Sequence, residues 1–245
     1  MISNFARGLQ FTLRGFGTIN QPGLRRYVVI PLLINLVLIS LGTYYLAREF
    51  ETLMQHLLPD WLSWLQWLLW PLFVLTLALA VFYLFTLVAN VVAAPFNAFL
   101  AEAIEARRRG TPPPTDYSLK GMLRMGWIGI KASLQMLVYQ LVRAIPLLII
   151  SLIPVVNVIS PLLWFLFAAW VLPQQYLTYP AGNHGLDFRA QQARQKGHEK
   201  DMLGLGTGLA AMTMIPVLNF ISIPVGVAAA TLLWVERMPA EAGSD

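Results

Sequence analysis

The sequence contains no cysteine, and this absence removes whole classes of chemistry. Without thiols the chain forms no disulfide, has no cysteine nucleophile and holds no metal through sulfur. Its three histidines are scattered at no spacing typical of metal ligands: His56, His184 and His198. Neither a nucleophile with its base nor a phosphate-binding glycine loop is recognisable. We therefore expect no catalytic residue, no metal and no cofactor, and the protein is predicted not to be an enzyme.

Charged residues are also scarce, at 12% of 245 residues, whereas hydrophobic residues make up 57%. Water-soluble domains carry about 25% charged and about 45–50% apolar residues. So few charges cannot cover a folded surface in water, and much of the surface must therefore face lipid. The composition predicts an all-α integral membrane protein formed as a single membrane domain over residues 1–245.

The net charge is +5, and its placement indicates the partner. Basic residues flank the apolar runs, as the positive-inside rule expects of cytoplasmic loops. Four arginines and no acid precede Tyr27, and a second basic cluster follows Glu102. The pattern predicts a lipid bilayer rather than nucleic acid as the partner, with both termini in the cytoplasm.

Residues 1–18 place apolar side chains at helical spacing: Phe5, Leu9, Leu13 and Phe16. This pattern predicts an amphipathic helix lying on the membrane surface; the alternative is a short, partly ordered tail. Since the first uncharged run of spanning length begins only at Tyr27, the N-terminus is not expected to be a cleavable signal peptide.

Two long apolar segments follow. Residues 27–48 are predicted as the first transmembrane helix, because a span needs about 20 apolar residues. Residues 65–101 are predicted as the second helix and its extension, within an uncharged run from Trp61 to Ala101 that is too long for one perpendicular span. The excess must be interfacial, steeply tilted or buried in protein. Four tryptophans suggest an aromatic belt at its start: Trp61, Trp64, Trp67 and Trp70.

The second half of the chain contains an internal repeat. Residues 153–160 (IPVVNVIS) match residues 215–222 (IPVLNFIS) at six of eight positions. Proline removes a helical hydrogen bond and asparagine favours turns, so each copy predicts the tip of a helical hairpin, with Asn157 and Asn219 as turn residues.

The arms of these hairpins, over residues 132–179 and 202–235, look short for a bilayer core of about 30 Å. Only ten uncharged residues separate Arg143 from Pro154, and 14 residues run from Met202 to Ile215. The pattern favours two re-entrant hairpins over ordinary but short spans. Arg143 then either marks the membrane interface or pairs with an internal glutamate.

Gly23-Leu24-Arg25-Arg26 stands directly before the first long helix and is the first candidate site. A helix N-terminus offers free backbone N–H groups, glycine allows close approach, and two guanidinium groups add directed charge. Together these features can hold a tetrahedral oxyanion. The alternative is that Arg25 and Arg26 anchor the helix at the headgroups.

Glu102, Glu105 and Arg109 form the second candidate, at the end of the long apolar run. Their spacing puts them on one helical face, and Glu105 and Arg109 have the favourable i, i+4 orientation. Charges in this position either face an interior or aqueous path or form an ordinary solvated helix end.

These motifs in this order resemble the CysZ-type sulfate transporters of the bacterial inner membrane. The resemblance rests on Gly23-Leu24-Arg25, on Pro95-Phe96-Asn97 before the Glu102–Arg109 segment, and on the paired Ile-Pro-x-x-Asn tips. It covers nearly the whole chain.

The resemblance implies sulfate uptake for cysteine biosynthesis, two long transmembrane helices, two partially penetrating hairpins and homo-oligomers built on dimers. It implies that Gly23, Leu24, Arg25 and Arg26 bind sulfate. Glu102, Glu105 and Arg109 then line the conduction path. A transporter of another small solute and a membrane-shaping scaffold are the alternatives.

Overall fold

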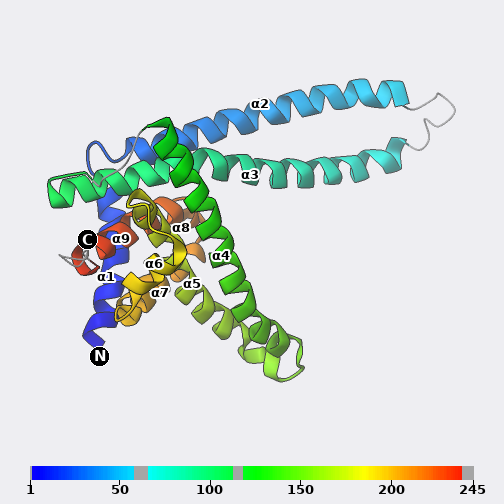
Figure 1. Cartoon of the computed structure of the whole chain (residues 1–245). Coiled ribbons are helices and arrows are strands. Elements are labelled where there is room, and N and C mark those ends of the chain that lie inside the picture. Colours follow the sequence, from blue (N-terminus) through cyan, green and yellow to red (C-terminus); the bar gives the residue numbers. More distant parts are fainter. Residues whose placement is uncertain (1, 58–65, 113–117, 239–245) are drawn as a thin grey trace. The chain divides into compact units, whose positions relative to one another are not determined.

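The structure is a computed structural model that describes residues 2–57, 66–112 and 118–238 (Figure 1). Within these residues every regular element is a helix and no strand is present. Contacts divide the chain into two compact units, one of Met1–Arg25 with Asn97–Asp245 and one of Arg26–Phe96. The prediction of an all-α protein is confirmed for the described residues.

The unit Arg26–Phe96 contains α2 (Arg26–Leu57) and the first part of α3 (Gln66–Arg109). These helices cover most of the two predicted transmembrane segments, and their apolar side chains are largely exposed, as Leu36 and Leu75 illustrate. Such surfaces are costly in water and suited to lipid. Of the predicted belt, Trp67 and Trp70 are exposed, whereas Trp61, Trp64 and the first residue of the 65–101 segment lie outside the described residues.

Four stretches of the described residues are long and apolar enough to cross a membrane, judged by length and composition. They are Arg26–Tyr45, Val88–Arg109, Trp127–Leu152 and Val156–Asn183. Helices of this length and composition are compatible with an integral membrane protein.

The end of α3 accounts for the excess length of the second apolar run. From Asn97 onward α3 belongs to the other unit, where Leu100 is fully buried and Ile104 is only 1% exposed. Among the explanations that the sequence left open for this extension, the structure shows burial in protein for Asn97, Leu100 and Ala101, whereas Phe99 is exposed.

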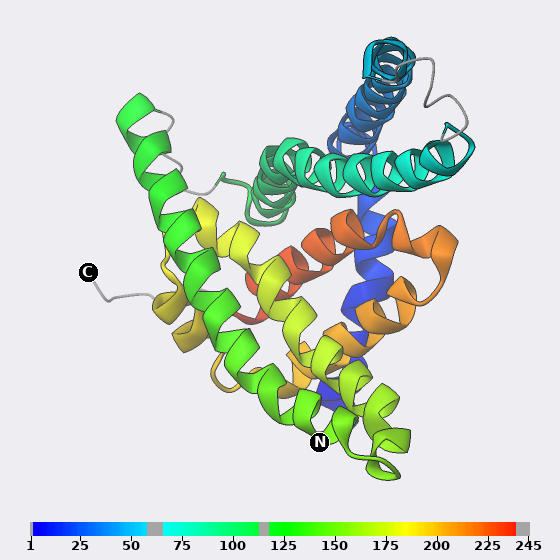
Figure 2. The same ribbon diagram turned by 90° about the vertical axis from the view of Figure 1, so that its right-hand side faces the viewer.

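The core of the larger unit is formed by four helices: α1 (Ile2–Ile19), α5 (Ser160–Asn183), α7 (Glu199–Thr213) and α9 (Ser222–Arg237). Each of α1 and α5 packs against both α7 and α9 (Figure 2). The consequence is that α9 is enclosed by protein, and all residues in Val225–Trp234 are buried. This arm therefore faces other helices rather than lipid.

Helix α1 has a buried face that the sequence analysis did not identify. Glycines at the contact with α7 bring the backbones together: a Cβ at Gly8 would collide with the backbone of Asp201, and one at Gly204 with that of Phe5. Small residues allow such close packing of helices in membranes. The predicted apolar line instead faces outward, with Leu13 71% exposed. These exposed apolar side chains are available to lipid. That α1 lies on the membrane surface stays a prediction.

Both copies of the repeat lie in turns between helices, as predicted. The first separates α4 (Leu119–Leu152) from α5 and contains the short 3-10 helix η2 (Val156–Ile159). The second separates α7 from α9 and contains α8 (Pro216–Asn219).

The two tips also share a hydrogen bond at equivalent positions. Asn157 donates its backbone N–H to the carbonyl of Ile153 at 3.0 Å, and Asn219 donates to Ile215 at 2.9 Å. The asparagines are therefore turn residues. Apolar side chains at both tips are exposed, among them Val155 at 87% and Phe220 at 78%.

The first hairpin differs from the expectation of short arms. Helix α4 has 34 residues and runs through Arg143 without a break. The exposed guanidinium of Arg143 lies over the ring of Tyr139, 3.4 Å from its centroid. No glutamate pairs with Arg143 in the part of the chain that the structure describes. The arms of the second hairpin are short, with 15 residues in α7 and 16 in α9. Between the hairpins lies α6 (Phe188–Gln195), which is capped by Asp187.

Candidate functional site

The loop between α1 and α2 has a defined shape that depends on glycine. Gly23 has φ +86°, a conformation that side-chain-bearing residues rarely adopt, and no heavy atom lies within 4 Å of the position of a Cβ. Leu24 is 3% exposed and donates its N–H to the carbonyl of Gln21 at 3.1 Å. Leu24 therefore anchors the loop in the protein, while Gly23 leaves its backbone open to a ligand.

Both candidate arginines are exposed and partly fixed by the protein. Arg25 donates from Nε to the carbonyl of Asn20 at 2.6 Å. Arg26 donates from Nη2 to the hydroxyl of Tyr27 at 2.9 Å and lies over its ring. Because Arg26 is the first residue of α2, the unpaired N–H groups of that helix's first turn begin here. The contact of Arg25 uses Nε alone, and its terminal nitrogens have no partner among the described residues.

Arg107, at the end of α3, holds the loop in place. Its Nη1 donates to Oε1 of Gln21 at 2.9 Å and its Nη2 donates to the carbonyl of Pro22 at 3.1 Å. From the sequence, Arg107 is simply part of the basic cluster that follows Glu102. The structure instead makes it a direct link between the loop and the helix that carries the second candidate site.

Glu105 is the centre of the second candidate site. It is fully buried, and its Oε1 lies 3.1 Å from Nε of Arg109 and 2.8 Å from Nε2 of His184. Its Oε2 has no hydrogen-bond partner among the described residues. Glu102 is half-buried one turn earlier on the same helix. Because Glu105 is fully buried, the alternative of an ordinary solvated helix end is wrong for this residue. A buried carboxylate is stabilised by its charged and hydrogen-bonding partners.

A second guanidinium approaches the same cluster. Arg194 lies over the ring of Trp234 at 4.8 Å, and the ring of His184 lies 5.9 Å from that indole. Burial lowers the pKa of Arg194, and the neighbouring charge of Arg109 lowers it further, while Glu105 raises it. Nη1 of Arg194 and Nε1 of Trp234 are buried donors without a partner among the described residues. One buried carboxylate is thus accompanied by two guanidinium groups, which leaves an excess of positive charge and of donors.

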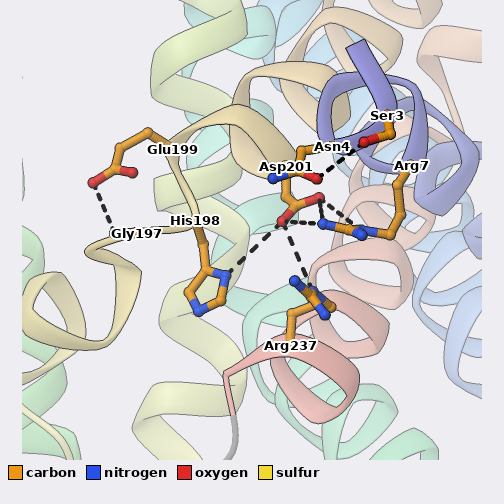
Figure 3. A network of polar contacts seen from close by, with 8 residues as sticks. All are labelled: Ser3, Asn4, Arg7, Gly197, His198, Glu199, Asp201 and Arg237. Carbon is orange, nitrogen blue, oxygen red and sulfur yellow. Dashed lines mark hydrogen bonds and ion pairs between the residues drawn. The ribbon is translucent and has the colours of Figure 1, made fainter. Parts of the chain in front are cut away.

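A third ionic cluster fixes α1 to the rest of the unit (Figure 3). Asp201 of α7 is 1% exposed and accepts two hydrogen bonds from Arg7 of α1, at 2.9 and 3.0 Å. Arg237 of α9 and His198 each lie 3.9 Å from the same carboxylate. The hydrogen bonds that Arg7 donates to Asp201 raise the pKa of Arg7. These contacts join α1, α7 and α9. The cluster therefore stabilises the packing of α1, the helix that leads into the loop at Gly23.

Comparison with known proteins identifies the family. The sequence profile of the family described as "Sulfate transporter CysZ/Etoposide-induced protein 2.4" matches residues 11–224. The chain belongs to this family. It is 43% identical over 239 residues to "Sulfate transporter CysZ" of Pseudomonas fluorescens, which covers 96% of this chain and 95% of that protein. It is also 40% identical over 234 residues to the protein of the same name from Salmonella typhimurium, a match that covers 94% of this chain and 92% of that protein.

In this CysZ-family chain the structure brings Glu105 and Arg109 together as the spacing predicts. The sequence analysis did not connect His184, Arg194 or Trp234 with them. No local pattern joins His184 to Glu105, since the two are 79 positions apart. The sequence pointed only to Glu105 itself, because an acidic side chain at the end of an apolar helix tends to be paired with a partner inside the protein. It did not indicate which residue that partner is.

Within the residues that the structure describes, no three histidine, aspartate or glutamate side chains are grouped as a metal site would require. The polar groups of the candidate site are guanidinium, imidazole, indole and backbone donors around one carboxylate. This chemistry suits a hydrogen-bond-accepting anion.

Proposed function

We propose that this chain carries sulfate across the bacterial inner membrane and so supplies cysteine biosynthesis. Full-length similarity to relatives named as sulfate transporters supports the substrate, and four apolar helices support the membrane location. The observation that carries the proposal is the loop at Gly23-Leu24-Arg25-Arg26, which presents an open backbone and two exposed guanidinium groups where a long helix begins.

Sulfate binds at this loop. The dianion accepts hydrogen bonds from the terminal nitrogens of Arg25 and Arg26 and from N–H groups of the first turn of α2. Leu24 supplies no polar side chain, and its role is to fix the loop by burial. The positive φ of Gly23 supports this assignment, because any side chain there would strain the turn.

The Glu105 cluster lines the conduction path. Its unpaired donors, on Arg194 and Trp234, provide a second station for the anion. Glu105 holds Arg109 and His184 in position, and its negative charge keeps the station from binding sulfate too tightly to release it. Glu102 lies on the same helix and contributes to the same path.

The membrane arrangement follows the same proposal. Helices α2 and α3 span the bilayer, the two hairpins enter it by their exposed apolar tips, and α1 lies at the interface with Leu13 towards lipid. Both termini are cytoplasmic. The functional form is a homo-oligomer built on dimers, which covers part of the exposed apolar surface. Size-exclusion chromatography with light scattering measures this state.

The test of the binding site is calorimetric titration of purified full-length protein with sulfate. Arg25→Ala with Arg26→Ala abolishes binding if the proposal holds, whereas Arg189→Ala, an exposed arginine of α6, leaves it unchanged. Unchanged affinity in the double variant would remove the site.

Flux of radiolabelled sulfate into liposomes that contain the protein tests transport itself. Competition by thiosulfate, phosphate or chloride that exceeds competition by sulfate identifies a transporter of another solute. Absence of any flux, with the protein correctly inserted, favours a membrane-shaping scaffold.

A further inference from the structure

A cavity of about 220 Å³ lies in the larger unit, and its lining contains none of the residues assigned to sulfate. It is bounded by α4, α5, α6 and α7, and its lining includes aromatic, amide and charged side chains. Sites for drug-sized ligands measure about 300–1,000 Å³. This cavity therefore suits a smaller polar group, on the scale of a phospholipid headgroup.

One wall of the cavity has the character of a membrane–water interface. The rings of Tyr139 and Trp170 are stacked, with centroids 5.6 Å apart and planes at 28°. The guanidinium of Arg143 lies 3.4 Å from the centroid of Tyr139 and 5.6 Å from that of Trp170. Tyrosine, tryptophan and a basic residue are enriched together where helices leave the hydrocarbon.

The opposite wall carries one charge of each sign. Lys196 and Glu199 are both exposed and both line the cavity. Glu199 accepts a hydrogen bond from the backbone N–H of Gly197 at 2.9 Å, drawn in Figure 3, and this bond lowers the pKa of Glu199. The carboxylate is therefore ionised at neutral pH. An ionised carboxylate in the lining repels a simple anion. The cavity therefore favours a ligand that carries one positive and one negative group.

An apolar surface continues from the aromatic wall. On α4, directly beside Tyr139, Val138 is 60% exposed and Val142 is 58% exposed, and Leu141 between them is 56% exposed. Side chains of this kind are stabilised by contact with acyl chains. The cavity and this surface together match the two parts of one lipid molecule.

We propose that the cavity binds the headgroup of a phospholipid that carries a primary ammonium group next to its phosphate, as phosphatidylethanolamine does. The phosphate lies towards Lys196, the ammonium donates to Glu199, and the acyl chains lie along Val138 and Val142. This site is separate from the sulfate site and does not depend on the proposed transport.

Native mass spectrometry of the purified full-length protein tests the site. We expect palmitoyl-oleoyl phosphatidylethanolamine to bind more tightly than the phosphatidylcholine and phosphatidylglycerol of the same chains. Choline has no N–H to donate to Glu199, and phosphatidylglycerol has no cation. Glu199→Gln then reduces the affinity for the ethanolamine lipid about two- to fivefold, as for an exposed ion pair, and removes the preference. Lys200→Gln is the matched control, because Lys200 is exposed on the same helix and does not line the cavity.

Three outcomes overturn the proposal. Equal affinity for the three lipids removes the role of Glu199. A preference that survives in Glu199→Gln places the lipid elsewhere. Binding of soluble glycerophosphoethanolamine as tight as that of the intact lipid shows a site for a free metabolite rather than for a lipid. An unchanged thermal unfolding temperature of Glu199→Gln in detergent verifies that the variant is folded.

Discussion

The guanidinium of Arg107 lies 2.9 Å from Oε1 of Gln21 and 3.1 Å from the carbonyl of Pro22, and so joins the end of α3 to the turn that presents Gly23. The buried Glu105 lies two residues before Arg107 on the same helix, α3. The proposed binding loop and the proposed conduction path are therefore connected by one side chain.

Removing this link should weaken sulfate binding. Arg107→Gln loses both hydrogen bonds to the loop, and since a charged hydrogen bond contributes about 1.5–3 kcal/mol, we expect roughly a tenfold loss of affinity. Arg108→Gln is the matched control, because Arg108 is exposed and its one ion pair within the described part of the chain is a long contact with Glu236, at 4.0 Å. Calorimetric titration measures both. Equal affinities in the two variants would show that the loop holds its shape without Arg107.

Replacing the buried carboxylate should separate transport from binding. Glu105→Gln removes the buried carboxylate that Arg109 and His184 share, and because Arg109 keeps part of its surface in solvent, we expect a loss of about 1.5–3 kcal/mol in the free energy of unfolding. We expect a lower thermal unfolding temperature in detergent and a loss of sulfate flux into liposomes. Because the loop retains Arg25 and Arg26 and the second station loses its negative charge, sulfate should bind no more weakly than to the unmodified chain. Normal flux in Glu105→Gln would exclude the cluster from the path.

The sequence predicted those parts of the fold that depend on local pattern. Apolar runs predicted helices, and the repeated Ile-Pro-x-x-Asn predicted two turns because proline and asparagine act on their own backbone. The burial of α9 was not predictable in this way, since an apolar helix has the same composition whether it faces lipid or protein. Likewise, Gly8 and Gly204 approach each other across nearly two hundred residues, and neither glycine signals its partner.

The Asp201 cluster should govern stability rather than transport. Asp201→Asn removes a buried carboxylate that two partly exposed arginines share, so we expect a clear fall in the thermal unfolding temperature. Glu236→Gln breaks the more exposed pair with Arg14, whose Nη1 donates at 2.8 Å, and should cost about 1 kcal/mol or less. Thermal unfolding in detergent compares the two. A variant at Asp201 that unfolds like the one at Glu236 would show that packing alone holds α1.

The last prediction uses two glycines of the same helix. Gly8 faces the backbone of Asp201, whereas no heavy atom lies within 4 Å of a Cβ at Gly17. Gly17→Ala should therefore be neutral or stabilising by up to about 1 kcal/mol, because alanine favours the helix. Gly8→Ala gains the same helical preference but forces α1 away from α7, so its unfolding temperature should fall. The tilt of α1 also moves Leu24, and sulfate affinity should fall with it. If both variants unfold at the same temperature, the close contact between α1 and α7 does not exist in the folded protein.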